Sequence, residues 1–225
     1  MPQEYKIVYE GGEAEIVEKK SRFIARVKKT QTVEEAETFI NECKKKYWDA
    51  RHNCSAFVIG NTNQNLRSND DGEPSGTAGK PILEVLLAEE ICNVTVVVTR
   101  YFGGTLLGTG GLVRAYQKAT KEALANSVII KKEEGKKIQL SADYNDVGKL
   151  QYLFGQKGIP ILDSEYTQNV RMTVLVPAKA VEAIEKEITE TTGGRAMIEE
   201  GETLFFGNAH GKMVLFDNNS SDMQK

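Results

Sequence analysis

Apolar and polar residues alternate along the first half of the chain with periods that predict a mixed α/β domain. Residues 5–9 and 13–17 alternate as strands do, and Gly11-Gly12 between them predicts a β-hairpin. Residues 94–99 are β-branched and apolar on both faces, which predicts a buried central strand. Further strands are expected at residues 21–27, 53–60, 64–68 and 128–130, and helices at residues 32–46, 81–90 and 112–126.

The helix expected at residues 32–46 carries its own start signal. Thr32 is a capping residue, and Glu35 three positions later is the second member of a capping box. Val33, Ala36 and Phe39 then recur at helical spacing, which predicts that this side of the helix faces the core.

The pattern restarts after the polar segment K-K-E-E-G-K-K at residues 131–137, which predicts a linker. Strands are expected at residues 137–142, 159–164, 169–176 and 195–206, and helices at 145–157 and 178–191. This β-α-β-β-α-β order is typical of a ferredoxin-like domain. The sequence therefore predicts an α+β protein with an N-terminal domain at 1–132, a linker at 133–136, a ferredoxin-like domain at 137–210 and a C-terminal tail at 211–225. The end of that tail is expected to be disordered.

The composition of the 225 residues, with 40% apolar and 27% charged side chains, is that of a soluble globular protein. Residues 1–132 carry 19 basic and 17 acidic side chains, whereas residues 133–225 carry 10 and 15. No apolar run approaches the roughly 18 residues that span a bilayer, so no membrane association is expected. The three cysteines have no metal-type spacing, which predicts free buried thiols and a cytoplasmic protein.

A glycine-rich segment between a buried strand and a helix is the first candidate site. Helix N-termini attract anions, glycines allow close backbone approach, and arginines supply forked donors. The spacing matches neither a Walker loop nor G-x-G-x-x-G, so anion or nucleic-acid binding and a purely structural turn both stay open. The residues concerned are Arg100, Tyr101, Phe102, Gly103, Gly104, Gly108, Gly110, Gly111 and Arg114.

An acidic, glycine-containing segment forms the second candidate. Asp70, Asp71 and Glu73 precede the helix at residues 81–90, so they either complement the helix dipole or act as a metal or acid/base group. No metal site or cofactor is assigned. His52, Ser75 and Thr77 are expected to line an adjacent cleft, without an assigned catalytic role.

The basic segment at residues 19–29 is the third candidate. Lys20, Arg22 and Phe23 lie on an expected strand, where basic and aromatic side chains hold RNA phosphates and stack on bases. A solvated edge strand protected by lysines has the same sequence pattern.

The segments D-D-G-E-P-S-G-T-A-G-K-P-I-L at 70–83 and V-T-R-Y-F-G-G-T-L-L-G-T-G-G-L-V-R-A-Y at 98–116 closely resemble the signature of the Impact/YigZ family, in its bacterial two-domain branch. The resemblance implies an N-terminal domain similar to the second domain of ribosomal protein S-five. It also implies a ferredoxin-like second domain similar to the last domain of elongation factor G. The family implies translation regulation and nucleic-acid binding, and it supplies no catalytic residues.

Three functions are compatible with these observations. A translation-linked regulator that binds RNA, the ribosome or a translation factor is favoured. The alternatives are an enzyme acting on a small phosphorylated or nucleotide ligand, and a protein–protein adaptor that uses Tyr101 and Phe102 as anchors. A binding protein is favoured over an enzyme, and the sequence does not predict an oligomeric state.

Overall fold

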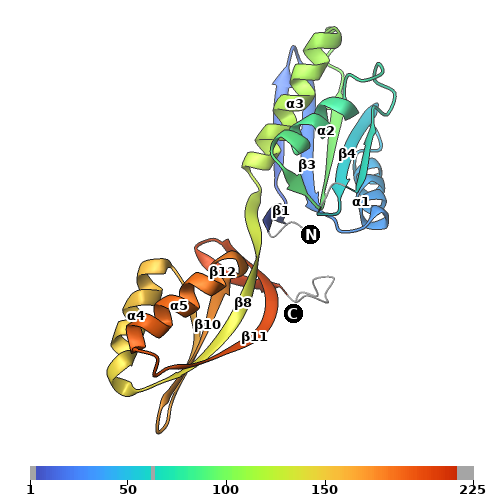
Figure 1. Cartoon of the computed structure of the whole chain (residues 1–225). Helices are drawn as coiled ribbons and strands as arrows, with labels where there is room; N and C mark the ends of the chain where they lie inside the picture. Colours follow the sequence, from blue (N-terminus) through green and yellow to red (C-terminus); the bar gives the residue numbers. More distant parts are fainter. Residues whose placement is uncertain (1–3, 62–63, 217–225) are drawn as a thin grey trace. The chain divides into compact units, whose positions relative to one another are not determined.

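The computed structural model describes residues 4–61 and 64–216 (Figure 1). In these residues five α-helices combine with strands in two sheets, so the fold is mixed α+β. The end of the predicted tail, residues 217–225, lies outside the described residues. The chain divides into two compact units, Met1–Lys132 with Asn208–Lys212, and Glu133–Gly207 with Met213–Lys225. None of the helices in the described part has the length and apolar content needed to cross a bilayer.

The first unit is built on an antiparallel five-stranded sheet with the order β2-β3-β7-β4-β5. Its strands are β2 (Glu13–Glu18), β3 (Ser21–Lys29), β4 (His52–Ile59), β5 (Asn65–Asn69) and β7 (Val94–Tyr101). The prediction of a buried central strand is confirmed, because β7 is the middle strand and only Tyr101, at its end, is partly exposed.

Helices cover both faces of this sheet (Figure 1). On one face, the Phe23 ring of β3 meets the Tyr116 ring of α3 (Thr109–Ala125) edge-on, with 5.2 Å between centroids. Arg26 of β3 points to the opposite face of the sheet, where its guanidinium lies over the Phe39 ring of α1 (Val33–Lys46). The side of α3 also packs against α2 (Gly79–Ala88). The predicted cap of α1 is confirmed, because Thr32 Oγ1 accepts a hydrogen bond from the Glu35 amide at 3.1 Å.

The predicted hairpin at the N-terminus is wrong. Strand β1 (Glu4–Glu10) pairs in parallel with the short strand β6 (Ile91–Cys92), which the apolar pattern does not reveal, and β2 pairs with β3. Gly11 and Gly12 instead allow close packing: a Cβ on Gly11 would lie 2.0 Å from the Val27 carbonyl oxygen. The Gly12 carbonyl accepts a hydrogen bond from the Val27 amide at 2.9 Å. Gly11 is therefore required by contact with β3, and Gly12 by contact with the end of α3, because a Cβ on Gly12 would lie 2.6 Å from the Asn126 carbonyl carbon.

The second unit follows the predicted element order and has one additional strand. Its sheet runs β9-β10-β8-β11-β12, and α4 and α5 pack on one face through Leu150, Phe154 and Ile184. A short 3₁₀ turn, Ala178–Ala180, precedes α5. The elements are β8 (Val128–Ala142), α4 (Tyr144–Lys157), β9 (Ile161–Tyr166), β10 (Val170–Pro177), α5 (Val181–Thr192), β11 (Met197–Ala209) and β12 (Lys212–Phe216).

The predicted linker at residues 133–136 is the middle of strand β8. This segment pairs antiparallel with β11, and Gly135 lies opposite Leu204. Gly135 leaves room for the Phe206 ring, because a Cβ at this position would lie 2.7 Å from Phe206 Cε1. The polar, glycine-containing sequence therefore reflects a half-exposed strand packed beneath an aromatic ring.

The packing role of Gly135 can be tested by comparing its substitution with that of a glycine that packs against nothing. Gly135→Ala is expected to lower the free energy of unfolding by about 1–3 kcal/mol, because the new methyl group overpacks the Phe206 contact. Gly155→Ala is the matched control: it lies inside α4, and a methyl group there would meet no atom within 4 Å, so it should raise stability by about 0.5–1 kcal/mol. Urea denaturation measures both. Equal effects of the two substitutions would contradict the packing role of Gly135.

Candidate functional site

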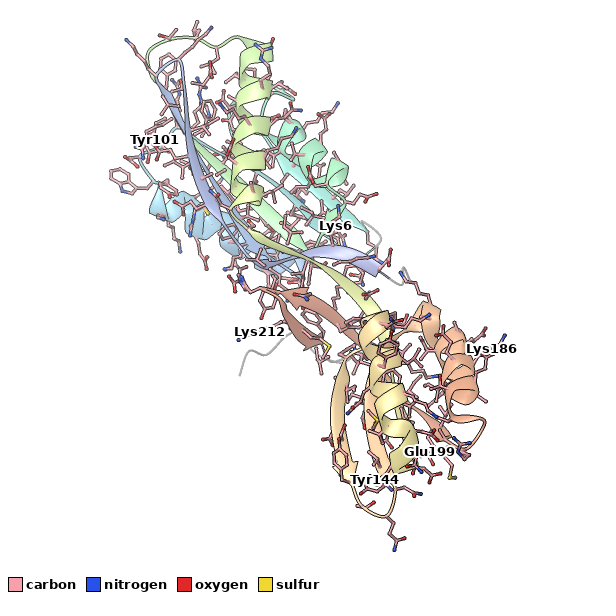
Figure 2. All side chains as sticks on the ribbon, turned by 90° about the vertical axis from the view of Figure 1, so that its left-hand side faces the viewer. Lys6, Tyr101, Tyr144, Lys186, Glu199 and Lys212 are labelled. Atoms are coloured by element: carbon pink, nitrogen blue, oxygen red, sulfur yellow. The ribbon has the colours of Figure 1, made fainter. Side chains whose placement is uncertain are left out.

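The two glycine-rich segments of the sequence meet at one end of the first sheet. The loop before α2 contains Glu73, and the loop before α3 continues from the end of β7 at Arg100 and Tyr101. A direct contact joins them, since Arg100 Nη1 lies 2.6 Å from Glu73 Oε1. Figure 2 labels Tyr101 at this end of the unit.

The Glu73–Arg100 ion pair is buried, with side-chain exposures of 3% and 7%. The Tyr116 hydroxyl donates to the same Glu73 oxygen at 2.9 Å. The Arg100 guanidinium lies 5.6 Å from the ring centroids of both Phe23 and Phe102. Arg100 Nε is buried and has no hydrogen-bond partner among the described residues.

These contacts correct the expectation that Arg100 is available as a forked donor to an anion, and they favour the structural alternative for this residue. Its guanidinium instead neutralises a buried carboxylate, because one charge left alone in the core is far more costly than a pair.

The other two predicted acidic residues are also engaged in structural contacts. The Asp70 carboxylate accepts hydrogen bonds from the amides of Gly76, Ala78 and Gly79 at 2.8–3.0 Å, immediately at the start of α2. Asp71 accepts from the Asn53 amide at 2.7 Å and pairs with Lys44 at 2.6 Å. This arrangement supports the helix-dipole interpretation of Asp70. Within residues 4–61 and 64–216, no three His, Cys, Asp or Glu side chains are grouped so as to hold a metal ion.

The predicted cleft residues mainly hold the acidic loop in place. His52 Nδ1 lies 2.9 Å from the Asp71 carbonyl oxygen, and Cys54 Sγ donates to the Asp70 carbonyl at 2.9 Å. Burial raises the pKa of the Cys54 thiol, which keeps it protonated and unreactive at neutral pH. Thr77 is buried and donates to the Pro74 carbonyl at 2.6 Å, whereas Ser75 is exposed. All three cysteines are free and buried, as predicted.

The loop between β7 and α3 has two kinds of glycine. Gly103 permits a close approach to the β2–β3 turn, because a Cβ there would lie 2.0 Å from the Lys20 carbonyl carbon. Gly104 and Gly108 have φ values of 83° and 73°, in the region that glycine favours. Gly108 ends the loop as the N-cap of α3 and gives it no side-chain cap.

The start of α3 is exposed around Arg114. A Cβ on Gly110 would lie 3.5 Å from Arg114 Nη1, so this guanidinium reaches back over the first turn, and Gly111 packs against Leu107. Phe102 is exposed, as predicted for an adaptor anchor, but the Tyr101 hydroxyl donates to Asp49 at 2.8 Å.

The basic segment at residues 19–29 is less available than the sequence indicates. Arg22 makes two hydrogen bonds to Glu15 of β2, at 2.8 and 2.9 Å, and Phe23 is fully buried in the core. Strand β3 lies inside the sheet, so β2 is the edge. Only the turn residues Lys19 and Lys20 project without an ion pair among the described residues. Phe23 is therefore a core residue, since it packs on Tyr116.

Sequence reasoning missed three residues at this end of the unit: Tyr116, Trp48 and Arg51. Tyr116 recurs at helical spacing with the apolar residues Leu112 and Ala119, and nothing in that periodicity indicates its hydrogen bond to Glu73. Trp48 offered a signal, because it is the sole tryptophan and lies in a polar segment, K-K-K-Y-W-D-A-R, outside any apolar periodicity.

The buried pair gives a stability prediction. Glu73→Gln should lower the free energy of unfolding by about 3–5 kcal/mol, because Arg100 stays charged and buried without a counter-charge. The double substitution Glu73→Leu with Arg100→Met should cost much less than the two single losses together.

Glu15→Gln is the matched control, because Glu15 pairs with Arg22 at the surface, where such a pair contributes less than about 1 kcal/mol. Chemical denaturation of the unaltered protein, Glu73→Gln, Glu15→Gln, the double variant and its two single components measures these differences. If Glu73→Gln costs no more than Glu15→Gln, the buried pair does not hold the signature loops together.

Comparisons with known proteins agree with the signature. Residues 19–124 match the Impact N-terminal domain, and residues 140–195 match a domain of unknown function, DUF1949. The chain is 42% identical to the IMPACT family member YvyE of Bacillus subtilis, over 93% of this chain and 96% of that protein. It is 38% identical to the IMPACT family member YigZ of Escherichia coli, over 78% and 87% of the two chains.

More distant similarities extend in two directions. The Protein IMPACT homolog of Dictyostelium discoideum is 36% identical over 41% of this chain and 28% of its own length. A solved structure, described as the crystal structure of an hypothetical protein, is 34% identical, with a TM-score of 0.57, over 90% of this chain and 99% of that one. The signature loops, the two matched domains and these relatives together show that the chain belongs to the IMPACT family.

Proposed function

We propose that this chain is a translation-linked regulator that acts in the cytoplasm by binding RNA, the ribosome or a ribosome-associated factor. Its relatives include eukaryotic proteins named IMPACT homologs, and the resemblance of the signature segments implies translation regulation. The binding surface is formed by the β2–β3 turn, the loop between β7 and α3, and the first turn of α3.

The observation that carries this proposal is a set of exposed cations around that loop. Lys19, Lys20 and Arg114 are exposed and make no ion pair among the described residues. The contact of Gly103 with Lys20 and the reach of Arg114 over Gly110 bring the turn and the helix start to the same loop. Unpaired surface cations are the groups that bind phosphates without first breaking an internal contact.

The loop itself adds chemistry suited to the same partner. The first amides of α3 carry partial positive charge, and Gly108 provides no side chain to cap them. Phe102 and Leu106 are 47% and 82% exposed, so the loop also presents apolar side chains. A phosphate-bearing partner with an apolar or aromatic contact matches this combination.

We propose a fold relationship that agrees with this function. The resemblance implies that the first unit is similar to the second domain of ribosomal protein S-five. In the second unit, the strand order β11-β8-β10-β9 and the β-α-β-β-α-β connectivity support the assignment of a split βαβ domain. Such a domain supports the proposed similarity to the last domain of elongation factor G.

Binding is favoured over catalysis because the predicted acid/base groups are occupied. Asp70 caps α2, Asp71 pairs with Lys44, and Glu73 neutralises Arg100. A carboxylate whose oxygens already accept hydrogen bonds from structural donors is poorly placed to reach a substrate proton.

The test is co-sedimentation with ribosomes across a series of salt concentrations. The double substitution Lys20→Ala with Arg114→Ala should weaken association, and the slope of log K against log salt should fall by about 2, or about 1 for each lost phosphate contact. Arg100 is left unchanged because its removal would disturb the core.

The control is Arg171→Ala with Lys186→Ala in the second unit, which removes the same charges from residues 65% and 77% exposed. This variant should sediment like the unaltered protein. Equal loss in both double variants would mean that net charge, and not the loop surface, governs association, and the proposed surface would be wrong.

A further inference from the structure

An exposed tryptophan lies at the same end of the first sheet, on the loop that joins α1 to β4. Trp48 is the sole tryptophan of the chain, and 83% of its surface is exposed. Tryptophan normally buries a large apolar surface. The described part of the chain leaves most of the Trp48 surface uncovered. Its position therefore calls for a partner from outside the chain.

The loop that carries Trp48 is held against the end of β7. The Tyr101 hydroxyl donates to Asp49, the neighbour of Trp48, at 2.8 Å. On the neighbouring strand β3, Arg22 is the register partner of Tyr101, and its guanidinium lies 5.4 Å from the centre of the Tyr101 ring. The indole is thus presented from a loop that a hydrogen bond ties to Tyr101, whose ring also contacts the Arg22 guanidinium.

Arg51 supplies a cation without an internal partner. It precedes His52, whose register partner is Arg100, so it lies level with Tyr101 at the sheet end. Arg51 is exposed and makes no ion pair among the described residues. Asp49 is occupied by Tyr101, and Glu15 by Arg22, so the nearby acids are already matched.

The surroundings of Trp48 favour a nucleic acid over a protein. Protein-binding anchors of this type lie in a desolvated centre ringed by other packed contacts. Here the charged residues within three positions of Trp48 are Lys45, Lys46, Asp49 and Arg51, of which Lys46 lies 3.9 Å from Glu13. A single-stranded nucleic acid suits an exposed indole near cations. Its bases can stack on the aromatic ring while its phosphates contact the positive charges.

We propose that Trp48 and Arg51 form a base-stacking site for single-stranded RNA, on a loop that Tyr101 anchors to the sheet. One unpaired base stacks on the Trp48 indole, and the adjacent phosphate pairs with Arg51. This inference rests on the proposed function and names its partner more narrowly. It concerns the sheet end on the α1 side, whereas the cations Lys20 and Arg114 border the glycine loop.

Because Trp48 is the sole tryptophan, its fluorescence reports this site alone. Titration with single-stranded RNA of about 12 nucleotides should quench the emission saturably, and rising salt should weaken the effect. In fluorescence anisotropy with labelled RNA, Trp48→Ala should lower affinity about tenfold or more, the loss expected for one stacked base. Arg51→Ala should lower the salt slope by about 1.

Tyr152→Ala is the matched control, since Tyr152 is 69% exposed on α4 of the second unit, and it should bind RNA like the unaltered protein. RNA binding with unchanged Trp48 emission, and equal affinity in Trp48→Ala, would overturn the stacking site and leave the proposed function standing. Quenching by polyglutamate but not by RNA would overturn it and assign the surface to an acidic protein segment. If the unaltered protein binds neither RNA nor ribosomes, the proposed function is overturned as well.

Discussion

The signature region of the first unit depends on one buried ion pair, Glu73 with Arg100. Two charges in a protein core cost far less free energy when each neutralises the other than when one is left alone. Tyr116 supplies one of those partners from α3, and the rings of Phe23 and Phe102 enclose the guanidinium. A single charge pair therefore fixes the acidic loop, the central strand and α3 relative to one another.

This constraint separates residues that maintain the site from residues that present it. The conformation of the acidic loop is set by Asp70 and Asp71, whose carboxylates accept hydrogen bonds from backbone amides. The residues left free for a partner are those with no internal charge to satisfy, such as Arg114 and Arg51. In this family signature, the three acidic residues and Arg100 are engaged in internal contacts, whereas Arg114 is exposed.

The glycines follow the same division. Gly11, Gly103 and Gly135 have no room for a side chain, because backbone or aromatic atoms already occupy the space. Gly104 and Gly108 have open space around them but adopt positive φ. The first group allows elements to pack, and the second shapes an exposed loop, although all five look alike in the sequence.

Local periodicity and capping signals were enough to predict several features before any fold was known. These include the buried strand, predicted at 94–99 and found at Val94–Tyr101, the cap at Thr32 and the β-α-β-β-α-β order of the second unit. Each is encoded within a few consecutive residues, so neighbouring side chains suffice to indicate it.

The pairing of strands and the meeting of charges emerged only in the folded chain. Folding separates β1 from β2, makes the predicted linker at 133–136 part of strand β8, and buries Arg100 against Glu73, 27 positions away. It also leaves Trp48 exposed on a loop whose next residue, Asp49, accepts a hydrogen bond from Tyr101, 52 positions along the chain. Strand partners and salt-bridge partners are chosen by proximity in space, whereas periodicity along the sequence records only whether a residue faces the core.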